Sequence, residues 1–284
     1  MSIRRSLLAV FALVALVGCV AHPRRNEHTP SSPAHRMVVL VPSLVEDAVA
    51  VGAAKNIVGV SHFTGDISAV AHVDRVADFS SVDVERIVTL HPDVIVGIPS
   101  QARLLAPLRR LHFRIVLLND DSYADIFRDI ARMGSITGRN AEATALIARL
   151  RATTVNMQRE AGRFAHRPRV FVALGTGPIW TVGPQSYIAT LIRLAGGTDA
   201  VTSLPSAYAQ YSAESLLALQ PDVIITDPEV HLASVLNREP WRSLRAVREH
   251  HVYLVDPPAI LQRPGPRYTQ GLAWLIEHLR ASLR

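Results

Sequence analysis

The segment that decides the fold occurs twice in the chain. Residues 84–96 read VERIVTLHPDVIV, and residues 213–225 read AESLLALQPDVII. In each copy a helix-like stretch is stopped by Pro-Asp and followed by a β-branched run typical of a buried strand. Asp83 and Ser212 stand where the N-cap of each helix is expected. Two similar units this far apart in the sequence predict two lobes of the same plan.

The sequence around each copy alternates strand-like and helix-like runs. In the first half, strands are expected at residues 37–41, 56–60, 94–97 and 114–118, with helices at 84–90 and 101–111. In the second half, strands are expected at 169–174, 223–226 and 252–255, with helices at 186–194, 213–219 and 267–283. This alternation is typical of βαβ units with parallel sheets. It predicts an α/β fold of two Rossmann-like lobes.

A single long helix is expected to join the lobes. Ala143, Leu146, Ile147, Leu150 and Val155 recur at roughly helical spacing, and no Gly or Pro follows residue 140 until residue 162. At about 1.5 Å per residue, a helix over residues 140–164 would span roughly 38 Å. The predicted organisation is an N-terminal lobe at residues 37–139, a spanning helix at 140–166 and a C-terminal lobe at 167–284.

The first expected strand leads directly into a helix. Ser43 and Glu46 have the spacing of a capping box, in which the serine caps the helix and the glutamate returns a hydrogen bond. Gly52 is expected to end this helix, because glycine readily adopts the left-handed conformation found after helix ends.

The first 36 residues have the composition of an export signal and a tether. Arg4 and Arg5 precede an apolar run over residues 7–17, which predicts a signal peptide at residues 1–18. The residues from Leu16 to the only cysteine, Cys19, resemble the lipobox of bacterial lipoproteins. The resemblance implies that the Cys19 thiol carries a lipid after cleavage. Residues 19–36 then read as a lipidated flexible tether.

Composition and charge exclude several classes of protein. The formal net charge of +6 arises from 29 Arg and the single Lys55 against 24 acidic residues, and the arginines are scattered along the chain. Nucleic-acid binding requires a clustered basic surface, so no nucleic-acid partner is expected. No run reaches the roughly 18 consecutive apolar residues of a membrane span. Membrane contact is therefore expected through the lipid anchor alone.

Two α/β lobes on one spanning helix, behind a lipoprotein signal, resemble the substrate-binding proteins of bacterial ABC importers for cobalamin, ferric siderophores and haem. The resemblance extends over nearly all of residues 37–284. The segments that carry it are Val39–Glu46, Val84–Val96, Gly175–Gly183 and Leu191–Gly197. It implies a monomeric solute-binding protein in the periplasm or on the outer face of the cell membrane, with no enzymatic activity and no cofactor of its own.

Glu85 and Glu214 occupy the second position of the two repeated helices. In the family that the chain resembles, such a pair docks into arginine pockets of the importer's two membrane subunits. A carboxylate at a helix N-terminus also stabilises the helix dipole by about 0.3–1 kcal/mol. Both roles are compatible, and the matched positions favour docking.

The ligand is expected between the lobes, at the loops that follow the strands. Phe63, Phe79, Trp180 and Tyr208 match positions where cobalamin binders place aromatic rings, and Arg263 matches a polar contact. Pro42 and Ser43 are further expected contacts. Ile98 and Ile260 depart from the cobalamin pattern, which has aromatic residues there. The favoured ligand is cobalamin or a related corrinoid.

Other ligands remain open at this stage. Haem needs an axial Tyr or His, which His62, Tyr208 or Tyr211 could supply. A ferric catecholate needs several convergent arginines, whereas the expected loops offer mainly Arg263. A neutral ferric hydroxamate siderophore is the nearest alternative to a corrinoid.

A hydrolase and a zinc protein are both disfavoured. No Gly-x-Ser-x-Gly elbow occurs, and Ser186 lacks the flanking glycine that such a turn needs. His250 and His251 form the only close histidine pair, and adjacent strand residues point to opposite faces. No metal site and no catalytic residue are therefore expected.

Overall fold

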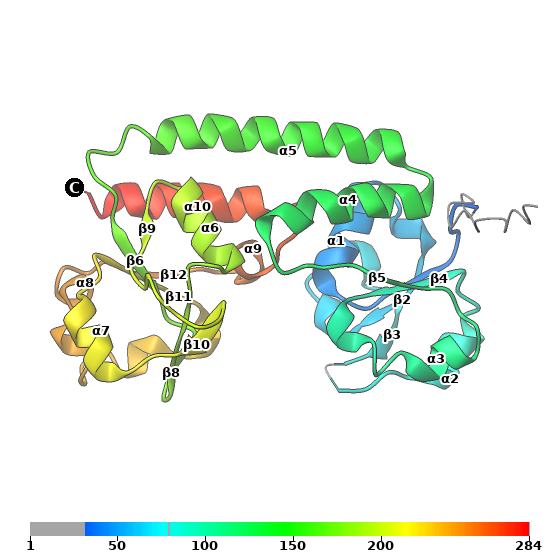
Figure 1. Cartoon of the computed structure of the whole chain (residues 1–284), viewed down its shortest axis with the longest axis horizontal. Helices are drawn as coiled ribbons and strands as arrows, with labels where there is room; N and C mark the ends of the chain where they lie inside the picture. Colours follow the sequence, from blue (N-terminus) through cyan, green and yellow to red (C-terminus); the bar gives the residue numbers. More distant parts are fainter. Residues whose placement is uncertain (1–31, 79, 284) are drawn as a thin grey trace, which may run out of the picture. The chain divides into compact units, whose positions relative to one another are not determined.

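The structure is a computed structural model that describes residues 32–78 and 80–283 (Figure 1). The described residues belong to one compact unit. The predicted signal peptide, Cys19 and most of the predicted tether fall outside the described residues, as does Phe79.

Lobe one is built on a five-stranded parallel sheet and helices α1 to α4. Its strands are β1 (Met37–Val39), β2 (Ile57–Ser61), β3 (Asp74–Ala77), β4 (Val94–Gly97) and β5 (Ile115–Leu117), in the order β3-β2-β1-β4-β5. Its helices are α1 (Pro42–Ala50), α2 (Val84–Thr89), α3 (Ala106–Arg110) and α4 (Tyr123–Thr137). This strand order is that of a Rossmann sheet, in which ligands bind at the carboxyl ends of the strands beside the switch point between β1 and β4.

Lobe two combines a four-stranded parallel sheet with a small antiparallel one. The parallel strands are β6 (Arg169–Val172), β9 (Thr198–Asp199), β11 (Val223–Thr226) and β12 (Val252–Leu254), in the order β12-β11-β6-β9. The antiparallel strands are β7 (Gly175–Thr176), β8 (Ile179–Val182) and β10 (Tyr208–Gln210). The helices are α6 (Tyr187–Leu194), α7 (Ala213–Leu219), α8 (Arg245–Arg248), α9 (Ala259–Gln262) and α10 (Tyr268–Ala281). Two parallel-sheet lobes are thus present, which confirms the predicted fold class.

The repeated segment folds alike in both lobes. Asp83 caps α2 and Ser212 caps α7, each through a side-chain oxygen that accepts a backbone N–H of the first turn. The Pro-Asp pair that follows has a matching role in each copy. Asp93 accepts the backbone N–H of Arg36 at 2.8 Å, and Asp222 accepts that of Arg169 at 2.7 Å. Each aspartate thereby ties its strand to the start of the neighbouring strand, β1 or β6.

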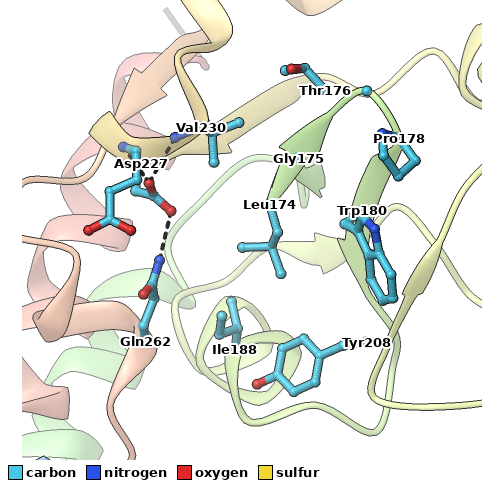
Figure 2. Close-up of a pocket in the computed structure, with 12 residues that line it drawn as sticks. Leu174, Gly175, Thr176, Pro178, Trp180, Ile188, Tyr208, Asp227, Val230 and Gln262 are labelled. Atoms are coloured by element: carbon cyan, nitrogen blue, oxygen red, sulfur yellow. Dashed lines mark hydrogen bonds between the residues drawn. The ribbon is translucent and has the colours of Figure 1, made fainter. Parts of the chain in front are cut away.

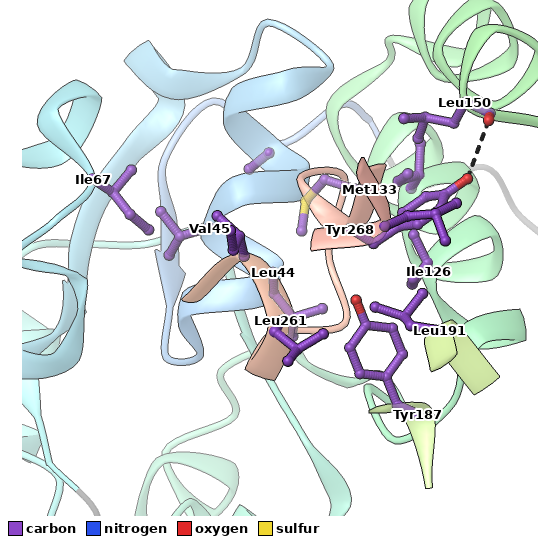
Figure 3. Packing of buried hydrophobic residues seen from close by; sticks show 14 of the residues in the cluster. Leu44, Val45, Ile67, Ile126, Met133, Leu150, Tyr187, Leu191, Leu261 and Tyr268 are labelled. Atoms are coloured by element: carbon purple, nitrogen blue, oxygen red, sulfur yellow. Dashed lines mark hydrogen bonds between the residues drawn. The ribbon is translucent and has the colours of Figure 1, made fainter. Parts of the chain in front are cut away.

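The hydrophobic core runs on both faces of each parallel sheet. Along β1, Met37 and Val39 join one buried cluster while Val38 joins another, as the alternation of side chains along a strand requires. The first of these clusters continues into lobe two, where it includes Val170 of β6 and Leu272 of α10. Figure 3 shows part of this cluster, with contributions from α1 (Leu44), α4 (Ile126), α6 (Leu191) and α10 (Tyr268). A core shared by both lobes limits how far one lobe can move relative to the other.

The long helix α5 (Asn140–Ala161) packs against α4 and α10 (Figure 1). At about 1.5 Å per residue its length is roughly 33 Å. Ala143, Leu146 and Leu150 are buried as predicted, but Val155 is exposed and Thr154 is buried in its place. The Thr154 hydroxyl lies 2.7 Å from the hydroxyl of Tyr268 on α10, so a polar contact completes this part of the buried face.

The predicted capping box at the start of α1 is wrong. The N-cap is Val41, two residues before Ser43, and the helix begins at Pro42, a residue that suits the first helical position because its missing N–H would be unpaired there anyway. Ser43 and Glu46 therefore lie inside the helix and make long-range contacts instead. Gly52 adopts φ +82° directly after the helix end, as predicted.

Two further helices differ from the prediction, one in its length and one because it was not predicted. The helix expected at residues 101–111 is shortened to α3 (Ala106–Arg110), which begins next to Pro107. Helix α4 was not predicted, although Ser122 and Asp125 form a capping box at its start and Gly138 follows its end at φ +72°.

Within residues 32–78 and 80–283, none of the helices has the length and apolar character needed to cross a membrane.

Candidate ligand-binding cleft

Three connected hollows mark the candidate site, which we call the cleft. The lobe-two hollow has a volume of about 730 Å³, the lobe-one hollow about 320 Å³ and the bridging hollow about 330 Å³. Glu229 and Gln262 line both the lobe-two and the bridging hollow. Phe63 and Arg263 line both the bridging and the lobe-one hollow. Volumes in this range are typical of small-molecule sites.

Aromatic side chains form one side of the lobe-two hollow (Figure 2). In the antiparallel pairing of β8 with β10, Trp180 lies opposite Gln210 and Val182 opposite Tyr208. Because alternate residues share a face, Trp180 and Tyr208 project from the same face as diagonal neighbours. Trp180 is 39% exposed and Tyr208 is 44% exposed. Figure 2 shows both rings near the aliphatic side chains of Leu174 and Ile188.

The opposite side of this hollow is polar. Asp227 is buried directly after β11, and its Oδ1 accepts the backbone N–H groups of Glu229 and Val230. Its Oδ2 accepts a hydrogen bond of 2.7 Å from the side-chain amide of Gln262 (Figure 2). The amide nitrogen of Gln262 is thus engaged, which leaves its carbonyl oxygen as an acceptor. Glu229 is exposed, and the structure shows no hydrogen-bond partner for its carboxylate among the described residues.

The lobe-one hollow lies at the carboxyl ends of β1 and β4. Pro42 starts α1 directly after β1, and Ile98 follows β4, so the loops at the switch point supply this wall. Phe63, which is 38% exposed, lies on a 3₁₀ turn (His62–Thr64) after β2. The hollow also reaches Asp78, whose carboxylate accepts hydrogen bonds from Ser80 and Ser81 that lower its pKa to about 2.

An ion-pair cluster of Glu46, Asp66, Arg263 and Arg267 joins the lobes, and two of its members, Asp66 and Arg263, line the cleft. The Arg263 guanidinium lies 3.2 Å from Glu46 and 2.8 Å from Asp66. Arg267 lies 2.6 Å from the same Glu46 oxygen and 3.2 Å from Asp66. Partial burial disfavours the charged form of Asp66, but the two arginines outweigh it and hold the pKa of this carboxyl below its usual value.

The cluster changes the interpretation of Arg263. The residue lines the cleft as predicted, yet its guanidinium also donates to the backbone carbonyl of Phe63. Its charge is already shared between two carboxylates. Any contact that Arg263 makes with a ligand therefore adds to an existing structural role.

The other predicted cleft residues divide into lining and buried groups. Ser43 is buried, lines none of the three hollows and donates a hydrogen bond of 2.9 Å to Asp120. Tyr211 is partly buried against Phe171 and lines none of the three hollows, so it is not placed to act as an axial haem ligand in the cleft. Ile260 is buried in the shared core. His62 lines the bridging hollow and Tyr208 the lobe-two hollow.

Lobe one also acts electrostatically on the aromatic wall of lobe two. Burial raises the pKa of Tyr208, and the carboxylates of Asp121 and Asp120 raise it further. These aspartates lie between β5 and α4 of lobe one. Tyr208 is therefore held in its neutral form and within range of negative charge from the other lobe.

Comparison with known proteins identifies the family of this chain. Residues 37–259 match the family described as periplasmic binding protein. The chain belongs to the periplasmic binding protein family. The resemblance inferred from the sequence is thereby confirmed.

Individual relatives agree with the family assignment. The chain is similar to the Uncharacterized ABC transporter substrate-binding lipoprotein YvrC of Bacillus subtilis (strain 168), with 26% identity over 252 residues, covering 86% of this chain and 79% of the relative. It is similar to the crystal structure of the periplasmic vitamin B12 binding protein BtuF of Vibrio cholerae, with 26% identity and a TM-score of 0.75, covering 88% and 98% of the two chains. It shares its fold with the apo form of the periplasmic heme-binding protein RhuT from Roseiflexus sp. RS-1, at 20% identity and a TM-score of 0.80, covering 88% of this chain and all of the other (100%).

The predicted docking residues of this periplasmic binding protein lie on matching surfaces. Glu85 and Glu214 are exposed in the first turns of α2 and α7. Neither lines the cleft. The two glutamates and the residues that line the cleft thus lie on separate parts of each lobe.

Within the part of the chain that the structure describes, no group of three or more His, Cys, Asp or Glu side chains could hold a metal ion. The two histidines were expected to be adjacent residues of a strand. In the structure His250 follows α8 at φ +60° and His251 precedes β12, so neither lies in a strand. Ser186 is a buried N-cap of α6 that accepts the N–H of Ala189, which is a structural role.

Sequence reasoning missed the polar side of the cleft. Asp227, Glu229 and Gln262 were not predicted as site residues. A usable signal was present, because Asp227-Pro228 directly follows β11, just as Ile98-Pro99 follows β4 in the other lobe. The rule that ligands bind at the carboxyl ends of parallel strands could have identified Asp227 and Glu229.

Proposed function

We propose that this chain is the substrate-binding component of an ABC importer and captures a corrinoid, cobalamin or a close relative, in the cleft. The observation that carries the proposal is the exposed aromatic wall formed by Trp180 and Tyr208, with Phe63 on the lobe-one side. The similarity to a vitamin B12 binding protein supports the same ligand class.

The chemistry of the cleft suits a corrinoid. A corrin has flat, largely apolar faces and a rim of amide groups. Trp180 and Tyr208 offer apolar surface for a face, and burying such rings typically contributes a few kcal/mol at about 25 cal/mol per Å². The polar side with Asp227, Glu229 and Gln262 offers acceptors for amide N–H groups. Phe79, which lies outside the described residues, is proposed as a further ring contact, as the resemblance implies.

We assign delivery of the ligand to the surfaces around Glu85 and Glu214, which we call the docking surfaces. Glu85 and Glu214 are proposed to pair with arginines of the two membrane subunits. Their exposure and their equivalent positions on two lobes support this assignment. Lipidation of Cys19 is proposed to hold the protein at the membrane, and mass spectrometry of the mature N-terminus should show an acylated cysteine.

Ligand capture is tested by incubating the purified protein with cyanocobalamin, haem or ferrichrome, a neutral ferric hydroxamate, and removing free ligand by gel filtration. The proposal predicts that the visible absorption of cyanocobalamin co-elutes with the protein in a 1:1 ratio. Retention of haem or ferrichrome without cyanocobalamin would replace the corrinoid. Haem is the second candidate, because Tyr208 and His62 line the cleft and could act as axial ligands.

A further inference from the structure

The charges around the cleft are unbalanced. The acidic side chains that line the three hollows are Asp66, Asp78, Asp227 and Glu229, whereas the only arginine or lysine among their described lining residues is Arg263. Asp120 and Asp121 add negative charge near Tyr208. Even with Asp66 paired to arginines, Asp78, Asp227 and Glu229 leave an excess of acidic residues in the lining, so we expect a negative potential in this space.

Arg263 does not offset this potential. Its guanidinium is paired with Glu46 and Asp66, and Arg267 pairs with the same two carboxylates. Two arginines and two carboxylates leave the cluster without surplus positive charge. An anionic chelate needs arginines whose hydrogen-bond donors are available to it, whereas Nη1 of Arg263 already donates to Glu46 and Asp66 and its Nη2 donates to the carbonyl of Phe63.

Glu229 is the acidic residue best placed to act on a ligand. It lies where the lobe-two and bridging hollows meet. Its backbone is fixed on a 3₁₀ turn (Pro228–Val230), because its N–H donates to Asp227 at 2.8 Å. Its exposed carboxylate has no hydrogen-bond partner among the described residues, so it is available to an incoming group.

The neighbouring polar atoms are acceptors as well. The side chain of Asp227 accepts three hydrogen bonds, one of them from the Gln262 amide nitrogen. Because the amide nitrogen is engaged in this bond, the carbonyl oxygen of Gln262 is left as an acceptor. The polar side of the cleft therefore presents oxygen acceptors, which require donors on the ligand.

We propose that the cleft selects a chelate that presents N–H donors and carries no net negative charge, and that Glu229 is the residue that enforces this selection. The proposal rests on the proposed function and narrows its ligand class. It favours amide-bearing corrinoids and neutral or cationic hydroxamates, and it excludes anionic ferric catecholates and ligands with a carboxylate at this edge.

The test compares two ligands that differ in one group. Cyanocobalamin and its peripheral monocarboxylic acids have nearly the same shape, but one amide donor becomes an anionic acceptor. Titration calorimetry at pH 7.5 should show that at least one monocarboxylate isomer binds about tenfold more weakly than the amide form, which is about 1.4 kcal/mol. Glu229→Gln should reduce that ratio to about twofold or less. Glu214→Gln, an equal change of charge on the same lobe but outside the cleft, should leave the ratio unchanged.

Equal binding of all the carboxylate isomers and the amide form, or a ratio that Glu229→Gln does not alter, would overturn the proposal. Absence of cyanocobalamin binding would instead reject the corrinoid. The same comparison is then made with ferrioxamine B, a cationic ferric hydroxamate, and its anionic N-succinyl derivative. Preference for the cation supports the selection by charge and preference for the anion overturns it. If neither hydroxamate binds, the charge selection fails, whereas retention of haem in the gel-filtration test would still leave the importer role with another ligand.

Discussion

At the scale of single residues, the structure contains buried carboxylates that resist ionisation. Asp47 of α1 is fully buried, and neither of its carboxylate oxygens has a hydrogen-bond partner among residues 32–78 and 80–283. Burial raises its pKa well above the usual value, and the nearby Asp129 of α4 raises it further. Burial likewise raises the pKa of Asp129 to about 7. The contact between α1 and α4 thus favours protonated side chains near neutral pH.

The raised pKa of Asp129 makes the free energy of unfolding depend on pH. Between the unfolded pKa near 4 and about 7, the folded protein keeps a proton on Asp129 that the unfolded chain has lost, so the free energy of unfolding falls as pH rises through this window. We predict that Asp129→Asn stabilises the protein at pH 8 by about 1–2 kcal/mol, after allowance for solvent screening, and flattens the profile. Urea denaturation from pH 5 to 8 measures this.

Asp125 gives a control of opposite sign. Its burial favours the neutral form, but hydrogen bonds from Ser122 and Arg128 outweigh this and lower its pKa. Asp125 therefore contributes stability that is present above its unfolded pKa and lost as pH falls. Asp125→Asn should destabilise the protein at pH 7. A destabilising effect of Asp129→Asn at pH 8 would contradict the assignment of a raised pKa.

Trp180 is the single residue on which the proposed ligand contact depends most. Removing its ring in Trp180→Ala should weaken cyanocobalamin binding by roughly ten- to a hundredfold, because a few kcal/mol of apolar burial are lost. Trp180→Phe keeps a ring and should lose clearly less. Fluorescence titration measures both, and equal affinity of the wild type and Trp180→Ala would remove this residue from the site.

At the scale of elements, prediction succeeded where the signal was local. The bounds of β4, β11 and α7 agree with the sequence pattern, since each combines a cap or a Pro-Asp stop with a short apolar run. The small antiparallel sheet was missed, because its strands have only two to four residues and β10 pairs with β8 through contacts distant in sequence. The aromatic cleft residues came from family resemblance, and none of them followed from spacing alone.

Long-range polar contacts were also beyond prediction. Glu46 and Arg263 are separated by 217 positions, so no periodicity links them. Ser43 and Glu46 had the spacing of a capping box, but Pro42 takes the first helical position and both side chains bond elsewhere. A local pattern was thus overridden by tertiary contacts.

The junction of α4, α5 and α10 depends on one hydroxyl. Tyr268 is fully buried, and its hydroxyl contacts Thr154 at 2.7 Å and Tyr123 at 3.4 Å. The same hydroxyl donates a hydrogen bond of 3.1 Å to the carbonyl of Leu150 (Figure 3). We predict that Tyr268→Phe lowers the free energy of unfolding by about 1–2 kcal/mol, because buried polar atoms lose a partner. Tyr253→Phe is the control, since its hydroxyl has no hydrogen-bond partner in the described part of the chain, and it should cost less than about 0.5 kcal/mol. Equal losses in urea denaturation would contradict this role.

At the scale of the whole molecule, the lobes are joined by a shared core and by the ion-pair cluster. The core cluster includes residues of both parallel sheets, and Arg263 and Arg267 reach Glu46 and Asp66 across the lobes. These contacts oppose a large hinge motion. A cleft that closes little must already have the shape of its ligand, so affinity depends on preformed surfaces.

The separation of docking surfaces from the cleft predicts a separation of effects. Glu85→Arg or Glu214→Arg should abolish uptake of radiolabelled cyanocobalamin by cells that depend on this protein, since losing one charge pair at an interface typically costs about 2–5 kcal/mol. Ligand affinity should remain within a few-fold of the wild type. Glu277→Arg makes the same change at an exposed site of α10 and should transport normally. Normal uptake by both Glu85→Arg and Glu214→Arg would contradict the docking role and leave the two glutamates only a role in helix stability.

The central claim is that the preformed cleft binds a corrinoid, and titration calorimetry of the wild-type protein with cyanocobalamin at micromolar concentration tests it most directly. The account predicts saturable binding of one molecule per chain with a Kd of about 1 μM or lower, which corresponds to about 8 kcal/mol or more of binding free energy. An absence of binding heat and of any spectral change at these concentrations, together with tight binding of haem or a ferric hydroxamate under the same conditions, would contradict it.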